Sequence, residues 1–488
     1  MTKQKIIFRA DGNSKIGLGH ISRCLALAEL LSKDHHTCFA LQEPDQNLLD
    51  SIRKVAHDVI VLVHSDPSNP AFLIELDPYL TSEDIIVLDG YHFNTAYEKN
   101  LKKSARALVS IVDIPSRHFA SDLIFNFCST LSASNYSKEF YTQLFLGFEY
   151  VFLRSPFLRS SPESKKFNNR LFLSMGGADS GNETLKILNE LIAIDYSGEI
   201  EVVIGNNYPH LTSLDPVLKN KDSVLLNQGL NAEEMFNCMN RCALAIVPPS
   251  TVALEFLSTG GLTFLHQTAN NQAFQKSYLI DTKLAFDYAE FKSIGLTDTE
   301  PLFQQCANLQ KNTFDGSSVA RVQKIFSDLE LSCQLSLRKV TTNDISQCFK
   351  WANDPDVRKY SYSTEPIPWE DHVLWISRKM ADPNCFYFIA EIGNSSIGQV
   401  RFDFLKDEDA FQISYALDQD WRGKGLGYYL LIRGIQKLNL LAPLKMIIGY
   451  VQKTNAASVK AFQKAGFAIF LSKSYPDSFK FELSVIPA

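Results

Sequence analysis

The feature that most constrains the fold of this chain is a repeated alternation of short apolar runs with amphipathic stretches. Several runs are apolar at consecutive positions, so both faces of the corresponding strands must be covered, as in a parallel sheet flanked by helices. The first series of runs consists of KIIFRA, TCFAL, DVIVLV, DIIVLD, ALVSIVD and DLIFNF. A second series consists of RLFLSM, EVVIG, SVLLN, ALAIVP and TFLHQ. The alternation predicts two consecutive α/β halves, each built on a parallel sheet.

Composition indicates where these halves begin and end. Residues 159–169 are rich in Ser, Pro, Lys and Asn, which is typical of a surface linker, so we place the halves at residues 1–158 and 159–330. We expect two Rossmann-like halves that face a cleft. After a helix-like stretch at 317–332, the runs LSLRKVT, FYFIAEI, SSIGQVRFDF, DAFQISYALD, LKMIIGYV and FKFELSV have the period and spacing of antiparallel strands. Residues 335–488 are therefore expected to form an α+β domain.

Charge and cysteine usage exclude several classes of protein. The chain has 488 residues and a net charge of −6, which gives no support for a nucleic-acid or anionic-membrane partner. No apolar run reaches the roughly 18 residues of a membrane helix, and the N-terminus lacks the apolar core of a secretion signal. The nine cysteines are scattered and odd in number, as expected of reduced thiols in the cytoplasm. Cys238 and Cys242 can share a helix face, but no second ligand pair follows, so we expect no metal site.

A glycine-bearing loop joins the first strand to the first helix in IIFRADGNSKIGLGHISRCLALAEL, residues 6–30. The helix is indicated by apolar residues at helical spacing, namely Ile21, Cys24, Leu25, Ala28 and Leu31. His20 therefore lies in or just before the first turn, where the positive helix end disfavours an imidazolium ion. Gly17 and Gly19 allow the backbone to approach a ligand closely. A neutral histidine in this position is suited to act as a general base.

Two other interpretations of this loop are open from the segment alone. A dinucleotide-binding fingerprint would need a third glycine where the chain has Ser22. A helix-capping histidine beside a structural turn is the interpretation without a catalytic function. The wider pattern of residues favours the catalytic interpretation.

Arg-Ala-Asp, followed by Ile-Gly-x-Gly-His-x-x-Arg-Cys-Leu-x-Leu-Ala, resembles the opening of the UDP-sugar hydrolase family of pseudaminic acid biosynthesis. This family releases UDP from a 2,4-diacetamido-2,4,6-trideoxy-altropyranose, and its fold is similar to that of B-type glycosyltransferases with two Rossmann-like halves. The resemblance covers residues 5–310 of the chain. It implies that His20 is catalytic and that Gly17, Gly19 and Arg23 lie at the substrate.

Further motifs extend the resemblance along the chain. IVLDGYHF contains Asp89 and Tyr91 of the family's Asp-x-Tyr element, at a strand end where open α/β sheets place ligand groups. Ile114 replaces an aspartate that is usual in the next segment. LGFEYVFLRSPF contributes Arg154, and LSMGGADSGNET contributes Gly177. The resemblance implies substrate contacts for Asp89, Tyr91, Arg154 and Gly177.

The stretch VPPSTVALE is expected to bind the nucleotide. Ser250 and Thr251 open a helix whose hydroxyl and N–H groups can hold a diphosphate. Glu255 corresponds to the residue that accepts hydrogen bonds from the ribose hydroxyls in similar glycosyltransferases. Glycines are usual in the family where this chain has Pro248 and Pro249, which removes a possible amide donor. The Asn-Gln pair that follows in the family is represented by Asn271 and Gln272.

The hydrolysis that the resemblance implies needs no metal, because UDP is already a good leaving group. His20 would position and deprotonate the water that attacks C1 of the sugar, or would stabilise the departing phosphate oxygen. Attack from the face opposite UDP would invert the anomeric centre. Tyr91 and Asn271 would orient the sugar.

A second resemblance covers residues 335–485. In ISYALDQDWRGKGLGYYLLIRGIQ, an Arg-x-x-Gly-x-Gly loop between a strand and a helix is similar to the pyrophosphate loop of the GCN5-related N-acetyltransferases (GNATs). Glycines and free N–H groups at a helix N-terminus can bind the pyrophosphate of coenzyme A. GYVQKTNAASVKAFQKAGF resembles the last motif of that superfamily. The acetyl-CoA contacts implied are Arg422, Gly423, Lys424, Gly425, Leu426, Gly427 and Asn455.

The proton transfers of acetylation are less defined by the sequence. Many GNATs protonate the CoA thiolate with a tyrosine seven residues after the asparagine, and here that residue is Phe462. The other candidate donors are solvent and the tyrosines Tyr428, Tyr429 and Tyr450. Four aromatic residues lie in the segment that usually lines the acceptor site, although a core position is the other interpretation for them. They are Trp351, Trp369, Trp375 and Tyr362.

Together the two resemblances predict a bifunctional cytoplasmic enzyme. In this pathway acetyl-CoA acetylates the 4-amino group of UDP-2-acetamido-4-amino-2,4,6-trideoxy-altropyranose, and the next step removes UDP. The alternatives are a UDP-sugar-dependent glycosyltransferase with an acetyltransferase domain of other specificity, and a domain that binds CoA without turnover. The expected partners are these small molecules, and the oligomeric state is left open.

Overall fold

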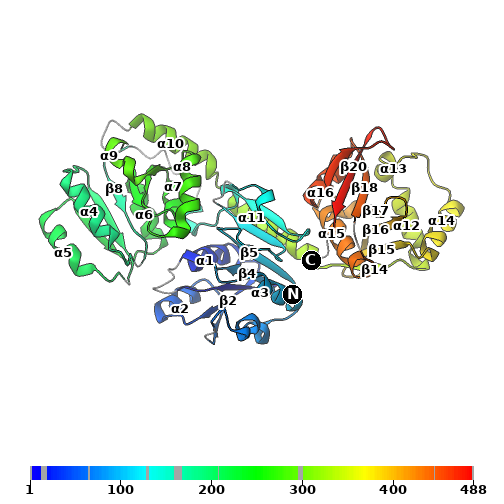
Figure 1. Cartoon of the computed structure of the whole chain (residues 1–488), viewed down its shortest axis with the longest axis horizontal. Helices are drawn as coiled ribbons and strands as arrows, with labels where there is room; N and C mark the ends of the chain where they lie inside the picture. Colours follow the sequence, from blue (N-terminus) through cyan, green and yellow to red (C-terminus); the bar gives the residue numbers. More distant parts are fainter. Residues whose placement is uncertain are drawn as a thin grey trace. The chain divides into compact units, whose positions relative to one another are not determined.

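The computed structural model describes residues 3–12, 19–63, 66–127, 131–158, 167–177, 179–206, 208–294, 300–443 and 446–485. Gly17, and residues 159–166 of the expected linker, lie outside the described residues. The chain divides into two compact units, Met1–Gln323 (unit 1) and Lys324–Ala488 (unit 2). Unit 1 contains two parallel sheets, and unit 2 contains one largely antiparallel sheet (Figure 1). None of the described helices is long and apolar enough to cross a lipid bilayer.

The first sheet of unit 1 has the strand order β3-β2-β1-β4-β5-β6-β7, and all its neighbours are parallel. The strands are β1 Lys5–Ala10, β2 His36–Gln42, β3 Asp58–Leu62, β4 Ile85–Asp89, β5 Ala107–Ile111, β6 Leu123–Asn126 and β7 Gln143–Leu146. The helices are α1 Gly19–Leu31, α2 Gln46–Arg53 and α3 Thr95–Ser104. Every residue of β4 and β5 is buried, which explains their unbroken apolar runs. The strand order reverses between β1 and β4, so ligands are expected beyond the carboxyl ends of these strands.

The second sheet repeats this order as β10-β9-β8-β11-β12-β13 and is also parallel. The strands are β8 Leu171–Leu173, β9 Ile200–Ile204, β10 Val224–Gln228, β11 Leu244–Val247, β12 Leu262–Leu265 and β13 Phe286–Asp287. The helices are α4 Glu183–Ala193, α5 Leu211–Asn220, α6 Ala232–Arg241, α7 Thr251–Thr259, α8 Ala273–Asp281, α9 Phe291–Ile294 and α10 Glu300–Thr313. Figure 1 shows α4 and α5 on one side of this sheet and α6 and α7 on the other. The reversal between β8 and β11 defines a second ligand position.

Unit 2 contains the strand order β14-β15-β16-β17-β18-β20-β19. The strands are β14 Leu335–Lys339, β15 Cys385–Ile392, β16 Ser395–Leu405, β17 Ala410–Leu417, β18 Met446–Gln452, β19 Ala468–Leu471 and β20 Ser478–Ser484. The helix expected at 317–332 forms as α11 Ser318–Cys333, which begins in unit 1 and continues into unit 2. The helices within unit 2 are α12 Ile345–Ala352, α13 Pro355–Lys359, α14 Trp369–Ala381, α15 Leu426–Asn439 and α16 Ala456–Lys464. Helices α15 and α16 cover one face of the sheet, and α12 and α14 cover the other (Figure 1).

One strand pair of unit 2 differs from the antiparallel arrangement expected from the sequence. Strands β17 and β18 are parallel, because α15 connects them and returns the chain to the same end of the sheet. They pair only at Phe411–Ile447 and Gln412–Ile448. In the described structure, residues 413–417 of β17 and 449–452 of β18 are not paired with each other. We call this opening between the two strands the wedge.

Candidate active sites

His20 lies in the first turn of α1, and its side chain is held by the carboxyl end of β4. Its Nδ1 atom lies 2.6 Å from Oδ1 of Asp89. Because a carboxylate can only accept, Nδ1–H donates this hydrogen bond, and Nε2 is the nitrogen that can accept a proton in the neutral ring. The ring of Tyr91 contacts the imidazole edge-on, with centroids 4.9 Å apart. The fully buried Asp89 side chain therefore fixes both the tautomer and the orientation of His20.

Arg23 lies one helical turn after His20 and joins two carboxylates. Its Nε and Nη2 atoms donate to Asp89 at 3.0 and 2.7 Å, and its Nη1 and Nη2 atoms donate to Asp113. Burial alone would lower the pKa of Arg23, but the two carboxylates raise it well above its usual value. Burial would raise the pKa of Asp113, but Arg23 keeps it below its usual range. The guanidinium and Asp113 are therefore both charged in the folded protein.

Asp113 was not identified from the sequence as a site residue. The available signal was its position just after β5, since β5 lies beside β4 and their carboxyl ends meet at one edge of the sheet. The hydroxyl of Tyr91 donates to Oδ2 of Asp113 at 2.7 Å. Asn271, from the second half of unit 1, donates from Nδ2 to the Tyr91 hydroxyl at 3.2 Å. Tyr91 and Asn271, which the sequence paired as sugar-orienting residues, are thus in direct contact.

Two carboxylates expected at the substrate are engaged by protein groups instead. Asp89 is directed to His20 and Arg23, so it lies behind the histidine. Glu255 is 3% exposed and accepts from Nε and Nη2 of Arg154 at 2.6 and 2.7 Å. A ribose hydroxyl at Glu255 would have to share oxygens that this bidentate pair already uses.

The N-terminus of α7 has the form expected for a diphosphate site. Ser250 is the extended residue before the helix, and Thr251 is the first helical residue. The N–H of Ser250 donates to the carbonyl of Pro248 at 2.8 Å, so the carbonyl of this proline orders the turn. The next N–H groups of a nine-residue helix point out of its N-terminus, where they can bind an anion.

Three further loop residues that the sequence placed at the substrate are Gly177, Gln272 and Gly19, and two of them contact neighbouring loop residues. A Cβ atom on Gly205, after β9, would lie 2.2 Å from the carbonyl oxygen of Gly177, so these two loops approach as closely as glycine allows. Gln272 accepts the N–H of Thr268 at 2.9 Å and so closes its own turn. Apart from its chain neighbours and the backbone of α1, no heavy atom of the described residues comes within 4 Å of a Cβ placed on Gly19.

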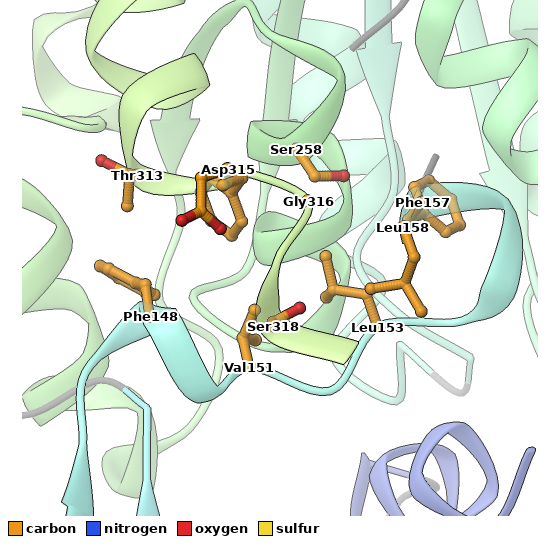
Figure 2. A pocket seen from close by; sticks show the side chains of 11 residues that line it. Phe148, Val151, Leu153, Phe157, Leu158, Ser258, Thr313, Asp315, Gly316 and Ser318 are labelled. Carbon is orange, nitrogen blue, oxygen red and sulfur yellow. The ribbon is translucent and has the colours of Figure 1, made fainter. Parts of the chain in front are cut away.

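Figure 2 shows a pocket that is lined by other residues of unit 1. Its walls come from the segment after β7, including Phe148 and Val151, and from the turn between α10 and α11, including Asp315. The water-sized space inside it is about 20 Å³, enough for a single water molecule. This pocket is too small for a nucleotide sugar, so the strand ends remain the candidate site.

In unit 2, the loop before α15 has the geometry of a phosphate-binding loop. Gly423 and Gly425 both have φ of +76°, a conformation that other residues rarely adopt. Apart from its two chain neighbours, no heavy atom in the described part of the chain comes within 4 Å of a Cβ placed on Gly423. Leu426 is buried, so its N–H and not its side chain is at the loop, at the N-terminus of α15. These open N–H groups, together with the unpaired backbone of the wedge, fit the pyrophosphate and the extended arm of CoA.

The polar side chains near this loop are held by protein partners. Arg422 donates to Asp354 and to the carbonyl of Leu417, both at 3.0 Å, so its side chain supports the loop from behind. The Lys424 ammonium lies 4.6 Å above the ring of Trp421. Asn455 caps α16 by accepting the N–H of Ser458 at 3.1 Å. The backbone N–H groups of the loop are therefore the main candidates for contacts with the pyrophosphate.

A hydroxyl pair that the sequence did not indicate lies beside the loop. The Tyr415 hydroxyl donates to Oγ of Ser458 at 3.1 Å, and it would lie 3.4 Å from a Cβ on Gly427. Burial raises the pKa of Tyr415, so the phenol keeps its proton. Phe462, at the position of the usual tyrosine, is buried and stacks on Phe481 at 4.8 Å.

The other aromatic candidates divide into core and surface positions. Tyr428 and Tyr429 are buried on α15 under the Lys464 ammonium. Trp351 is buried and donates from Nε1 to Asp418 at 2.7 Å, which identifies it as a core residue. The exposed members of the set are Trp369, Trp375 and Tyr362.

Comparison with known proteins supports a two-part chain. Residues 334–468 match the family model of the Acetyltransferase (GNAT) domain. The C-terminal unit is a GNAT acetyltransferase domain. The chain is 26% identical to the acetyltransferase PseH of Campylobacter jejuni over 133 aligned residues, which cover 27% of this chain and 82% of PseH. Spermidine N-acetyltransferase from Vibrio cholerae aligns with 31% of this chain and 95% of its own, at 18% identity and a TM-score of 0.28.

Two other matches are longer than the GNAT domain. One relative is the UDP-2,4-diacetamido-2,4,6-trideoxy-beta-L-altropyranose hydrolase of Campylobacter jejuni. The two proteins are 25% identical over 257 aligned residues, which cover 52% of this chain and 88% of the hydrolase. Unit 2 alone is too short to contain this match, so it extends into unit 1. An uncharacterized protein of Methanocaldococcus jannaschii is 22% identical over 497 residues, covering 95% of this chain and 96% of that protein. This alignment therefore spans both units of the chain.

Proposed function

We propose that this chain is a bifunctional enzyme of nucleotide-sugar metabolism. Unit 2 would acetylate the 4-amino group of UDP-2-acetamido-4-amino-2,4,6-trideoxy-altropyranose, and unit 1 would then hydrolyse the product to UDP and 2,4-diacetamido-2,4,6-trideoxy-L-altropyranose. The observation that carries the proposal is the His20–Asp89–Arg23 arrangement in a chain that also has a GNAT domain. Similarity to two Campylobacter jejuni proteins, a UDP-sugar hydrolase and an acetyltransferase, supports it.

The proposed hydrolysis assigns one task to each group at the strand ends. Nε2 of His20 accepts a proton from water, whose oxygen forms a bond to C1 of the sugar while the bond from C1 to the UDP oxygen breaks. Asp89 stabilises the imidazolium that results, because it accepts the Nδ1–H hydrogen bond. The N-terminus of α7 binds the departing diphosphate. Tyr91 and Asn271 contact the sugar from the two halves of unit 1, in a B-type glycosyltransferase arrangement.

The proposed acetylation uses the wedge of unit 2. Acetyl-CoA supplies the thioester, and the N–H groups from Gly425 onward bind its pyrophosphate. The backbone of β17 and β18 orders the extended arm, since each strand has an unpaired edge there. The Tyr415 hydroxyl, ordered by Ser458, is placed to return a proton to the thiolate when the amine takes the acetyl group. Replacement Tyr415→Phe should lower kcat for acetylation by about a hundredfold, whereas Tyr429→Phe should leave it unchanged.

The test is to follow the purified chain by NMR with the UDP-linked 4-amino sugar, with and without acetyl-CoA. Acetylation that precedes UDP release, and release that depends on acetyl-CoA, would support both activities and their order. In His20→Ala, the acetylated UDP-sugar should accumulate, because only the second step is blocked. UDP release at the same rate without acetyl-CoA would refute the proposed order. Release that needs an added sugar acceptor would instead indicate a glycosyltransferase.

A further inference from the structure

Three tyrosines from separate segments of unit 2 form an aromatic cluster, which we call the tyrosine platform: the exposed Tyr362 and the half-buried Tyr450 and Tyr475. The rings of Tyr362 and Tyr475 are 3.8 Å apart and nearly parallel, at 14°. Tyr450 of β18 packs against Tyr475 at 5.2 Å and 70°. The Tyr362 side chain remains 52% exposed, although its hydroxyl donates to Oγ of Ser478 at 3.1 Å. A flat ligand can stack on a ring that is held in place in this way.

Strand alternation places the platform on the face of the sheet opposite to the loop that binds CoA. Gly449 faces α16, because a Cβ at this position would lie 2.6 Å from the ring of Phe462. Tyr450 follows it in β18 and so points to the other face. Lys480 of β20 pairs with Tyr450, so the side chains of these two residues lie on the same face of the sheet. Ser478 lies two residues before Lys480 in β20, and its side chain is therefore on this face as well. An amine held on the platform side can therefore reach a thioester through the wedge.

Two cations lie next to the platform in sequence and are oriented by main-chain carbonyls. Arg358 donates to the carbonyl of Ser363, one residue after Tyr362. Lys453 directly follows β18 and donates to the carbonyl of Pro476 at 3.0 Å, one residue after Tyr475. A neutral carbonyl orients a cation without cancelling its charge. Aromatic faces beside such cations are the combination that binds a base together with its phosphates.

We propose that the tyrosine platform binds the nucleotide part of the acceptor, that is, the base and diphosphate of a nucleoside-diphosphate sugar. This inference rests on the proposed function and adds to it a nucleotide site in unit 2, separate from the one at α7 in unit 1. The base stacks on Tyr362, Arg358 and Lys453 face the diphosphate, and the 4-amino group of the sugar is directed into the wedge. The platform then selects nucleotide-linked amino sugars over free amino sugars.

The first test measures CoA formation by chromatography, in a His20→Ala background that does not consume the acceptor. Tyr362→Ala should raise the KM for the UDP-linked amino sugar about tenfold or more, as expected for loss of one base–aromatic stack, and should leave the KM for acetyl-CoA unchanged. Tyr362→Phe keeps the ring and should behave as the parent protein. Leu440→Ala, at an exposed apolar residue beyond the C-terminus of α15, is the matched control. Equal KM values for Tyr362→Ala and the parent protein would overturn the proposal.

The second test does not depend on turnover and counts the UDP molecules bound per full-length chain by equilibrium dialysis. The double variant Tyr362→Ala, Tyr475→Ala should bind one UDP fewer than the parent protein. An unchanged number of sites would overturn the proposal. If the parent protein forms no CoA from this acceptor, yet the double variant loses one UDP site, the proposed acetylation fails and the nucleotide site stands. Near-equal thermal midpoints of parent and variants would establish that the fold is retained.

Discussion

The contact between His20 and Asp89 allows a sharp prediction for Asp89→Asn. This substitution removes the charge of the buried Asp89 carboxylate, which accepts the Nδ1–H bond of the half-buried His20 at 2.6 Å. A hydrogen bond to a charged group contributes about 1.5–3 kcal/mol, and each 1.36 kcal/mol corresponds to a tenfold change in rate. The loss of this bond alone would therefore lower kcat for UDP release by roughly 10- to 150-fold. An asparagine can also donate to Nδ1 and so stabilise the wrong tautomer, which costs about 10⁴-fold in a serine-protease triad.

The assay is the initial rate of UDP release from the diacetylated UDP-sugar, measured over a range of substrate concentrations. Asp113→Asn is the matched control, because Asp113 contacts Arg23 and Tyr91 but has no hydrogen bond to His20 among the described residues. We expect the larger loss of kcat in Asp89→Asn and mainly a raised KM in Asp113→Asn. If Asp89→Asn retains kcat within threefold of the parent protein, or if the two variants lose kcat equally, His20 does not act through Asp89.

Two further predictions concern unit 2. Gly425→Ala should raise the KM for acetyl-CoA, because a Cβ is unfavourable at φ +76° in the loop. The control is Gly393→Ala, at φ +58° in the turn between β15 and β16, which should cost similar stability and leave the KM for acetyl-CoA unchanged. Equal effects of the two substitutions on this KM would argue against a cofactor role for the loop. Hydrogen bonds from Arg338 outweigh the effect of partial burial and keep the pKa of Asp344 below its usual range. The ionised Asp344 side chain therefore stabilises the folded state at pH values above its ordinary pKa, and this contribution is lost as the pH falls through the lowered pKa of the folded state. Arg338→Met should therefore shift the acid unfolding of unit 2 to higher pH. The transition can be followed by tryptophan fluorescence, because all four tryptophans of the chain lie in this unit. An unfolding transition at the same pH in the variant and the parent protein would refute this linkage.

The parallel sheets and the GNAT domain were predictable because their signals are local. Each apolar run named in the sequence forms a strand, as the exact match of KIIFRA with Lys5–Ala10 illustrates. Three strands were missed, namely β7, β13 and β19. β13 has only two residues, and β19 is exposed at all four positions, so neither has the burial pattern on which the prediction depends. The parallel direction of β18 follows from the crossover through α15, which is a property of the topology.

The candidate sites were predictable in part. Sequence spacing placed His20 and Arg23 on one helix, because residues three apart share a helix face. It could not reveal that Asp113 completes the charge network, since 90 residues separate Asp113 from Arg23. The Arg154–Glu255 pair spans 101 residues and likewise depends on tertiary folding. Contacts of this kind are set by the order of strands in the sheet, which periodicity does not encode.

The wedge between β17 and β18 makes the sheet of unit 2 one strand short in its middle. An ordinary edge strand exposes its unpaired N–H and C=O groups at the border of a sheet, but here two such edges face each other inside it. An extended chain with amide groups of its own can occupy this gap and supply the missing hydrogen bonds, much as a peptide does in strand addition. Within Ile413–Leu417, the N–H groups that point into the gap should then exchange fast in the free protein and slowly once the gap is filled, whereas the alternate N–H groups, which pair with β16, should be protected in both states. The hydrogen bonding in the interior of this sheet would thus be complete only in the complex.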